Sequence, residues 1–356
     1  MVIDARFWEG KRVLVTGHTG FKGGWLCVWL QRLGASLAGY ALAAPTKPSL
    51  FELARIGEGM TSVIGDVRDL PGLCNAFAAH RPEIIIHMAA QALVQASYRD
   101  PVETFGTNIM GTVNVLEATR RTPGVRAVIV VTSDKCYENR EWIWGYREHE
   151  AMGGRDPYSA SKGSAELVAA AYRRSFFGGA DAPAVATARA GNVIGGGDWA
   201  VDRLIPDMVR AYSCGRPAAI RNPMAVRPWQ HVLEPLAGYL MLAERLWERP
   251  SEFAESWNLG PGDADVAEVA DIADRVARLW GQGARWEQDR TPHPHEAHLL
   301  RLDCAKARTR LGWHPRMSLD TAVEWTVAWY RAALRGDDMR KLSEDQIAQH
   351  QAGGGA

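Results

Sequence analysis

A tyrosine and a lysine four residues apart are well suited to take a proton from a hydroxyl group. They are Tyr158 and Lys162 of the segment YSASK, at the head of a stretch with helical spacing. Residues four apart lie on one face of a helix. A lysine beside a tyrosine stabilises the phenolate, which lowers the phenol pKa from about 10 toward neutrality. The pair therefore suits a general base.

A hydroxyl, a carboxylate and an amine follow the apolar run at 127–131. They belong to Ser133, Asp134 and Lys135, at the expected carboxyl end of a strand, where ligands bind in open α/β sheets. Together they suit proton shuttling, and Tyr158 and Lys162 follow downstream. A solvated turn that caps a helix is the alternative interpretation.

Three glycines are spaced as in a dinucleotide-binding loop. Gly17, Gly20 and Gly23 form a GxxGxxG pattern between an expected strand at 12–16 and a helix at 25–33. Such a loop turns tightly, approaches a pyrophosphate closely and begins a helix whose N–H groups face the phosphates. An ordinary turn between strand and helix is the alternative, which the flanking elements disfavour.

The cofactor's ribose lacks its usual acidic partner in this sequence. The dinucleotide fingerprint places Asp or Glu about 20 residues further on, at the end of the second strand, but residues 39–44 read GYALAA. The residues alone therefore leave NAD and NADP both open. Asp66 and Val67 follow a third expected strand and suit contact with an adenine, or a helix cap before Leu70.

Strands alternate with helices over the first half of the chain. Apolar runs at 12–16, 37–42, 83–88, 127–132 and 184–188 alternate with helical stretches such as 102–120 and 159–177. This order predicts an α/β fold: a Rossmann-type, doubly wound parallel sheet with a smaller, interleaved C-terminal substrate domain. We expect a dinucleotide-binding domain at 1–190, with late strands at about 228–260. A substrate domain at 191–340 and a tail at 341–356 follow, and the final HQAGGGA should have nothing to pack against.

The composition does not favour several classes of partner. Lys plus Arg equals Asp plus Glu, at 41 each, so the net charge is zero. This balance does not favour broad binding to nucleic acid or to an anionic membrane. With no signal-like N-terminus and no run of about 18 apolar residues, we expect a cytoplasmic protein.

Metal binding is not expected. The five cysteines are scattered without a CxxC, which favours reduced thiols over disulfides or zinc. Prolines interrupt the histidines of HPHEAH at 293–298, and no further ligands are arranged around them. We interpret this segment as a loop that lines the substrate site.

Seven segments together resemble the CDP-glucose 4,6-dehydratases of the extended short-chain dehydrogenase/reductase family. They read TGHTGFKG, HMAAQALV, TSDKCYEN, YSASK, ARAGNVIGGGDW, RPWQHVLE and SWNLGP. The similarity runs from about Phe7 to about Tyr330. Lys135 is among its specific features, because the related dTDP-glucose and GDP-mannose dehydratases carry Glu there. The absent ribose carboxylate is also usual in this subfamily, so the resemblance favours NAD.

The resemblance implies a role for each catalytic candidate. Tyr158 would deprotonate the 4-hydroxyl of the sugar, and Ser133 would hydrogen-bond the same oxygen. Asp134 would protonate the departing 6-hydroxyl, and Lys135 would handle the C5 proton. Lys162 would bind the nicotinamide ribose and tune Tyr158.

The resemblance also implies the binding residues. Those for the cofactor are Gly17, Gly20, Phe21, Lys22, Gly23, Asp66, Val67, Ala89, Ala90, Tyr158 and Lys162. Those on the substrate side are Asn192 and Arg227 at the diphosphate, His298 in the loop, and Asn108. Asn108 resembles the family's structural asparagine, which orients the active-site lysine through water.

The implied reaction is the 4,6-dehydration of a nucleotide hexose, with CDP-D-glucose as the expected substrate. C4 is oxidised, water is lost across C5 and C6, and hydride returns to C6. The alternatives are a dehydratase or epimerase acting on another nucleotide sugar, and a non-catalytic dinucleotide-binding regulator. Relatives pair through the helices that correspond to 102–120 and 159–177, so we expect a homodimer or a higher homo-oligomer.

Overall fold

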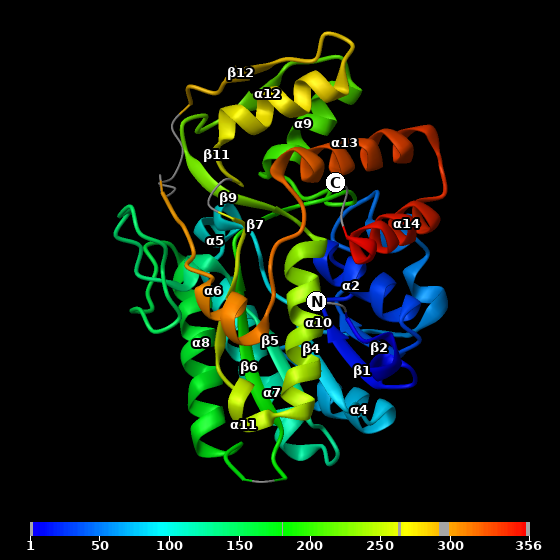
Figure 1. The fold of residues 1–356 in the computed structure, drawn as a ribbon, viewed down its shortest axis with the longest axis vertical. Helices are drawn as coiled ribbons and strands as arrows, with labels where there is room; N and C mark the ends of the chain where they lie inside the picture. Colours follow the sequence, from blue (N-terminus) through cyan, green and yellow to red (C-terminus); the bar gives the residue numbers. More distant parts are fainter. Residues whose placement is uncertain (1–2, 180, 263–264, 292–298, 354–356) are drawn as a thin grey trace.

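A parallel sheet forms the centre of the computed structural model, which describes residues 3–179, 181–262, 265–291 and 299–353 (Figure 1). The seven strands follow the order β10-β6-β5-β4-β1-β2-β3, and every neighbouring pair is parallel. Their bounds are β1 Arg12–Thr16, β2 Ser36–Ala41, β3 Thr61–Ile64, β4 Ile84–His87, β5 Ala127–Val131, β6 Ala184–Ala190 and β10 Ser256–Leu259. The predicted doubly wound α/β class is confirmed.

Helices cover both faces of this sheet, which is why its central strands are apolar throughout. Successive residues of β4 alternate between two cores: Ile84 and Ile86 lie in one cluster and Ile85 in the other. Helices α2 Phe21–Arg32 and α10 Leu233–Glu248 cover the first face, and α4 Leu70–His80, α7 Gly111–Arg121 and α8 Pro157–Ser175 cover the second. A strand buried on both faces reads as a continuous apolar run rather than an alternating one.

Two small sheets and three helices form a second layer above the carboxyl ends of the main strands (Figure 1). The sheets have the orders β11-β9-β7 and β12-β8. The bounds are β7 Asn192–Ile194, β8 Ala218–Ile220, β9 Val226–His231, β11 Val266–Glu268, β12 Trp286–Gln288, α9 Leu204–Ser213, α12 Val269–Trp280 and α13 Leu319–Arg335. Strand β10 of the main sheet lies between β9 and β11 in the chain, so the two parts are interleaved. The domain limits at 190 and 340 stay a prediction.

The remaining elements are short, except α14 at the end of the chain. They are α1 Ala5–Trp8, α3 Leu50–Leu53, α5 Val94–Arg99, α6 Pro101–Phe105, α11 Pro250–Phe253, α14 Met339–Ala352, and the tighter or wider turns η1 Ile56–Gly59, η2 Gly106–Met110, η3 Asp134–Cys136 and η5 Ala307–Leu311. The helix predicted at 102–120 is therefore divided, because η2 is a π-helical turn between α6 and α7. None of the helices in the described ranges is both long and apolar enough to cross a membrane.

The end of the chain packs more tightly than its sequence indicates. HQAGGGA was predicted to have nothing to pack against, and this is wrong for His350, which is buried at the end of α14. Its ring Nε2 lies 3.1 Å from Glu234 Oε1, and its ring contacts Trp29 edge-on. These partners are distant in sequence, so the local composition does not reveal them.

Candidate active site

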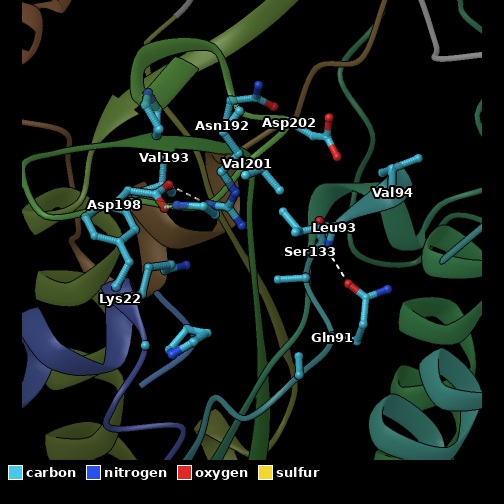
Figure 2. Close-up of a pocket in the computed structure, with 18 of the residues that line it drawn as sticks. Lys22, Gln91, Leu93, Val94, Ser133, Asn192, Val193, Asp198, Val201 and Asp202 are labelled. Carbon is cyan, nitrogen blue, oxygen red and sulfur yellow. Dashed lines mark hydrogen bonds and ion pairs between the residues drawn. The ribbon is translucent and has the colours of Figure 1, made fainter. Parts of the chain in front are cut away.

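A cavity of about 780 Å³ opens at the carboxyl ends of the main strands, between the sheet and the second layer. The glycine loop, the turn after β5, the start of α8 and strands β7 and β9 line it. Figure 2 labels Lys22, Ser133 and Asp198, from three separate segments of the chain, among the residues that line this cavity. Ligands bind at this end of parallel sheets because connecting loops from several strands meet there.

The glycine loop is too tight for side chains at two of its positions. Gly17 has a φ of 79°, and a Cβ there would lie 2.8 Å from the backbone nitrogen of Ala89. A Cβ on Gly23 would lie 2.1 Å from the carbonyl oxygen of Gly17. Gly20 is the N-cap of α2 and has no side chain to cap it, so the first N–H groups of the helix are open to an anion. This loop fits the pyrophosphate of a dinucleotide.

The part of the cavity beside the end of β2, where the ribose is predicted to lie, has an uncharged lining. Beyond β2, its described lining residues are Leu42, Ala43, Pro45, Thr46 and Ser49, none of which carries a charge. This surface offers no carboxylate to the 2′-hydroxyl of NAD and no guanidinium to the 2′-phosphate of NADP.

A histidine fills the space behind the ribose end. Burial lowers the pKa of His18 to about 4, so its ring is neutral at pH 7. Its Nε2 lies 2.7 Å from Ser62 Oγ. A Cβ at Gly39 would lie 2.3 Å from the ring, so the ring leaves no room for a side chain at this position. The uncharged character of this end therefore extends into the protein interior.

The predicted adenine residues line the cavity after β3. Val67 is buried and Asp66 is partly exposed. Asp66 Oδ1 accepts a hydrogen bond from the backbone nitrogen of Arg68 at 2.8 Å. The guanidinium of Arg68 holds the pKa of the Asp66 carboxyl below its usual value. Asp66 is thus an ionised acceptor at the rim. Ala89 and Ala90, beyond β4, also line the cavity.

Tyr158 and Lys162 lie in the first two turns of α8, and both side chains are buried. Asp156 is the N-cap of this helix, and its Oδ1 accepts from the Ser159 nitrogen at 2.9 Å. Lys162 Nζ donates to the carbonyl oxygen of Val131 at 3.3 Å. The Tyr158 hydroxyl is hydrogen-bonded to Ser133. The helix thus presents the pair to the turn after β5.

Burial dominates the titration of this pair. It raises the pKa of Tyr158 to about 12, although the Ser133 hydrogen bond and the Arg203 guanidinium act in the opposite direction. It lowers the pKa of Lys162 to about 8. The phenol pKa was predicted to fall toward neutrality, and this is wrong for the protein by itself. Desolvation of the phenolate raises the pKa more than the neighbouring cations lower it.

Burial has the largest effect on the pKa of the Asp134 carboxyl. Its side chain is only 2% exposed, and burial raises its pKa more than Lys135, the Ser133 hydrogen bond and Arg227 lower it. Oδ1 accepts from Ser133 Oγ at 2.9 Å, whereas Oδ2 has no hydrogen-bond partner among the described residues. Asp134 lines the cavity, so its carboxyl is placed to deliver a proton there.

The remaining predicted substrate residues divide into three groups. Asn192 of β7 and Arg227 of β9 line the cavity. Asn108 does not: it is buried in η2, where its Nδ2 donates to the carbonyl of Gln91 at 3.0 Å and to Ser161 Oγ at 2.8 Å. It therefore supports the residue next to Lys162 rather than a ligand. His298 lies outside the described residues.

Sequence analysis missed an arginine that faces the tyrosine. Arg203 lies just before α9, lines the cavity, and acts on the titration of Tyr158 and Lys22. Its Nη1 donates to Asp198 Oδ2 at 2.9 Å, and Figure 2 marks this ion pair at Asp198. The sequence does contain a signal, because Asp198 of GGGDW is followed five residues later by Arg203. Nothing in the local sequence links this arginine to Tyr158.

The fold and site define the class of protein first. A Rossmann sheet, a GxxGxxG loop and a buried Tyr-Lys pair on the helix after the fifth strand are the features of an extended short-chain dehydrogenase/reductase. A family model described as GDP-mannose 4,6 dehydratase matches residues 14–326, and the chain belongs to this family.

Named relatives agree with this assignment. The chain is 54% identical, over 98% of both chains, to a CDP-glucose 4,6-dehydratase of Salmonella typhimurium. It is 30% identical, over 76% of both chains, to a dTDP-glucose 4,6-dehydratase of Streptomyces antibioticus.

Solved structures share the fold. A UDP-glucose 4-epimerase of Thermotoga maritima superposes with a TM-score of 0.79 at 22% identity, covering 90% of this chain and 99% of that one. A dTDP-glucose 4,6-dehydratase of Bacillus anthracis in complex with NAD superposes with a TM-score of 0.74 at 20% identity, covering 91% and 97%. At these identities the likeness concerns the fold.

Proposed function

We propose that the protein catalyses the NAD-dependent 4,6-dehydration of CDP-D-glucose to CDP-4-keto-6-deoxy-D-glucose. The observation that carries this proposal is the convergence of Ser133, Asp134 and Lys135 with Tyr158 on one cavity beside a dinucleotide loop. Identity to the Salmonella CDP-glucose enzyme supports the choice of nucleotide.

The first task of the chain's residues is to take the proton of the 4-hydroxyl. When bound, NAD accepts hydride from C4 of the sugar and returns it to C6, and its cationic nicotinamide adds positive charge to the same cavity. Tyr158 takes the hydroxyl proton, and Ser133, already hydrogen-bonded to the phenol, holds the oxygen. Added positive charge favours the phenolate, which burial disfavours.

The second task is the loss of water across C5 and C6. A ketone at C4 acidifies the C5–H bond, so a base near C5 and an acid near the 6-hydroxyl are needed. Asp134 fits the acid, because burial raises the pKa of its carboxyl and so favours the protonated form. Lys135 follows in the same turn, lines the cavity, and takes the C5 proton.

A sugar-nucleotide epimerase of the same fold is the nearest competitor. Epimerisation needs the tyrosine, the lysine and a hydroxyl residue, but no acid for a leaving hydroxyl. The buried, partly unpartnered Asp134 carboxyl therefore favours elimination.

A panel of nucleotide hexoses tests the proposal. The protein is incubated with NAD and CDP-, dTDP-, UDP- or GDP-glucose and GDP-mannose, and the alkaline absorbance of a 4-keto sugar is followed. We expect the highest kcat/KM with CDP-glucose. A C4 epimer as the product, or a better 4-keto yield from another nucleotide, would contradict the proposal.

We also propose a cytoplasmic homodimer. Val102 of α6, Met110 of η2 and Leu167 of α8 are exposed apolar residues, and Val102 is 81% exposed. These elements are neighbours in the fold, and exposed apolar groups favour association. Sedimentation equilibrium should give twice the chain mass, and Val102→Asp should give a monomer; a wild-type monomer would exclude this pairing.

A further inference from the structure

Glu166 is a buried carboxylate one helical turn beyond Lys162 that the reaction has not used. Tyr158, Lys162 and Glu166 are spaced four residues apart on α8, so they share one face of the helix. The Glu166 side chain is 3% exposed. An ionised group at such depth is retained only where strong partners hold it.

Hydrogen bonds to Glu166 come from the residue that follows β5 and from the neighbouring strands β6 and β10. Thr132 Oγ1 donates to Oε1 at 2.5 Å, and Oε2 accepts from Thr187 Oγ1 at 2.7 Å and from Ser256 Oγ at 3.2 Å. Thr132 directly precedes Ser133, so the carboxylate ties the helix of the Tyr-Lys pair to the turn that carries the acid. The two catalytic segments are therefore held in one geometry.

Arg189 is the counter-ion of Glu166. Its Nη2 donates to Oε2 at 2.7 Å, and its side chain is also 3% exposed. Its Nη1 donates to the hydroxyl of Tyr137 at 2.6 Å. Although burial disfavours the anion, Arg189 and the hydroxyl donors hold the pKa of Glu166 below its ordinary value. Arg173 also acts on Glu166, from further along α8.

Glu166 is the anion among the groups that act on Lys162. Burial lowers the pKa of Lys162 to about 8, and Glu166 and Cys136 act against burial. Cys136 keeps its proton, because burial raises its thiol pKa. His87 is neutral, because burial lowers its pKa to about 3. Lys22 and Lys162 also interact through their charges, and burial lowers the pKa of Lys22.

We propose that Glu166 is a positioning residue that keeps Lys162 cationic and holds the Ser133 turn against α8, while Arg189 limits the strength of its field. A cationic Lys162 is what the Tyr158 phenolate requires. The inference rests on the proposed function only for its activity readout.

The two members of the ion pair should act on Lys162 with opposite signs. Glu166→Gln keeps the shape but removes the anion and leaves Lys162 facing Arg189, so the pKa of Lys162 falls further. Arg189→Gln leaves Glu166 uncompensated, with its hydroxyl donors still in place, so the pKa of Lys162 rises. An opposite charge nearby is worth about one unit or more. A residue that only filled space would not produce opposite shifts.

The direct measurement is an NMR titration of the Lys162 Nζ in protein labelled with ¹⁵N-lysine. The chain has seven lysines, and Lys162→Met assigns the signal. We expect the titration midpoint to fall by about one unit in Glu166→Gln and to rise in Arg189→Gln. Glu234→Gln is the matched control, because Glu234 is also buried but pairs with His350; it should leave the midpoint unchanged.

The pH profile of kcat/KM gives the second readout. Its alkaline limb should move to lower pH in Glu166→Gln and to higher pH in Arg189→Gln. Shifts of the Lys162 midpoint in the same direction in both variants, or no shift in the one that folds, would overturn the proposal. Inactivity of the wild type on CDP-glucose would instead contradict the proposed function and leave the titration result intact.

Discussion

Burial raises the pKa of two catalytic side chains, which hinders one in its role and helps the other. It raises the pKa of Tyr158, which must lose a proton, and of Asp134, which must keep one. Burial therefore shifts Asp134 toward the protonated form that its role requires, although Lys135 and Arg227 act in the opposite direction. Tyr158 can act as a base only when nearby positive charge lowers its pKa. The cations placed to do this are Lys162 and Arg203.

Replacement of Tyr158 by Phe should abolish turnover and leave the fold intact, because only the ionisable oxygen is lost. We expect kcat to fall well beyond tenfold, a change in activation free energy above about 1.4 kcal/mol. Steady-state kinetics with circular dichroism as the folding control would test this. A variant retaining more than about a tenth of wild-type kcat would show that Tyr158 is not the base.

Lys135→Met separates the base role of Lys135 from a purely electrostatic one. Met is uncharged and similar in length, so we expect the 4-keto sugar to form while the exchange of C5–H with solvent deuterium stops. NMR of the sugar in D₂O follows both. Exchange at a near wild-type rate would assign the proton transfer to another group.

At the scale of elements, the β2 end determines how the cofactor ribose is held. Because no charged side chain stands among the described lining residues there, NAD should bind more weakly than in dehydrogenases with a ribose carboxylate. A hydrogen bond to a charged group contributes about 1.5–3 kcal/mol, so affinity should be lower by about tenfold or more. Calorimetry on stripped protein measures it, and a submicromolar affinity would require another partner for the ribose.

The regular elements could be predicted because their signals are local. The apolar run of β4 and the glycine spacing after β1 indicate a buried strand and a phosphate loop wherever they stand. The π-helical turn η2, the packing of His350 and the approach of Arg203 to Tyr158 could not be predicted. Each depends on a contact between residues far apart in the chain, such as His350 with Glu234.

At the scale of the whole molecule, a buried lysine of the glycine loop links stability to pH. Burial lowers the pKa of Lys22 to about 7 from 10.5, with Lys162 and Arg203 adding to the effect and Asp134 opposing it. Between these values the unfolded chain binds a proton that the native protein does not, so the native state gains stability as pH rises. Below about pH 7 the buried charge costs stability in full.

Lys22→Met removes this dependence. We expect the difference in unfolding free energy, variant minus wild type, to be largest below pH 7 and to fall steadily as pH rises toward 10.5. Urea denaturation at a series of pH values measures this difference directly. A difference in unfolding free energy that stays constant, or increases with pH, would mean that Lys22 is not held neutral by burial.

The central claim is that one active site moves hydrogen from C4 to C6 while water leaves across C5 and C6. CDP-glucose deuterated at C4, incubated with the protein and NAD in ordinary water, tests it most directly. We predict a CDP-4-keto-6-deoxyhexose that carries the deuterium at C6 and a solvent proton at C5, with none formed by Tyr158→Phe. A product that keeps the deuterium at C4, with inverted configuration there, would contradict the account.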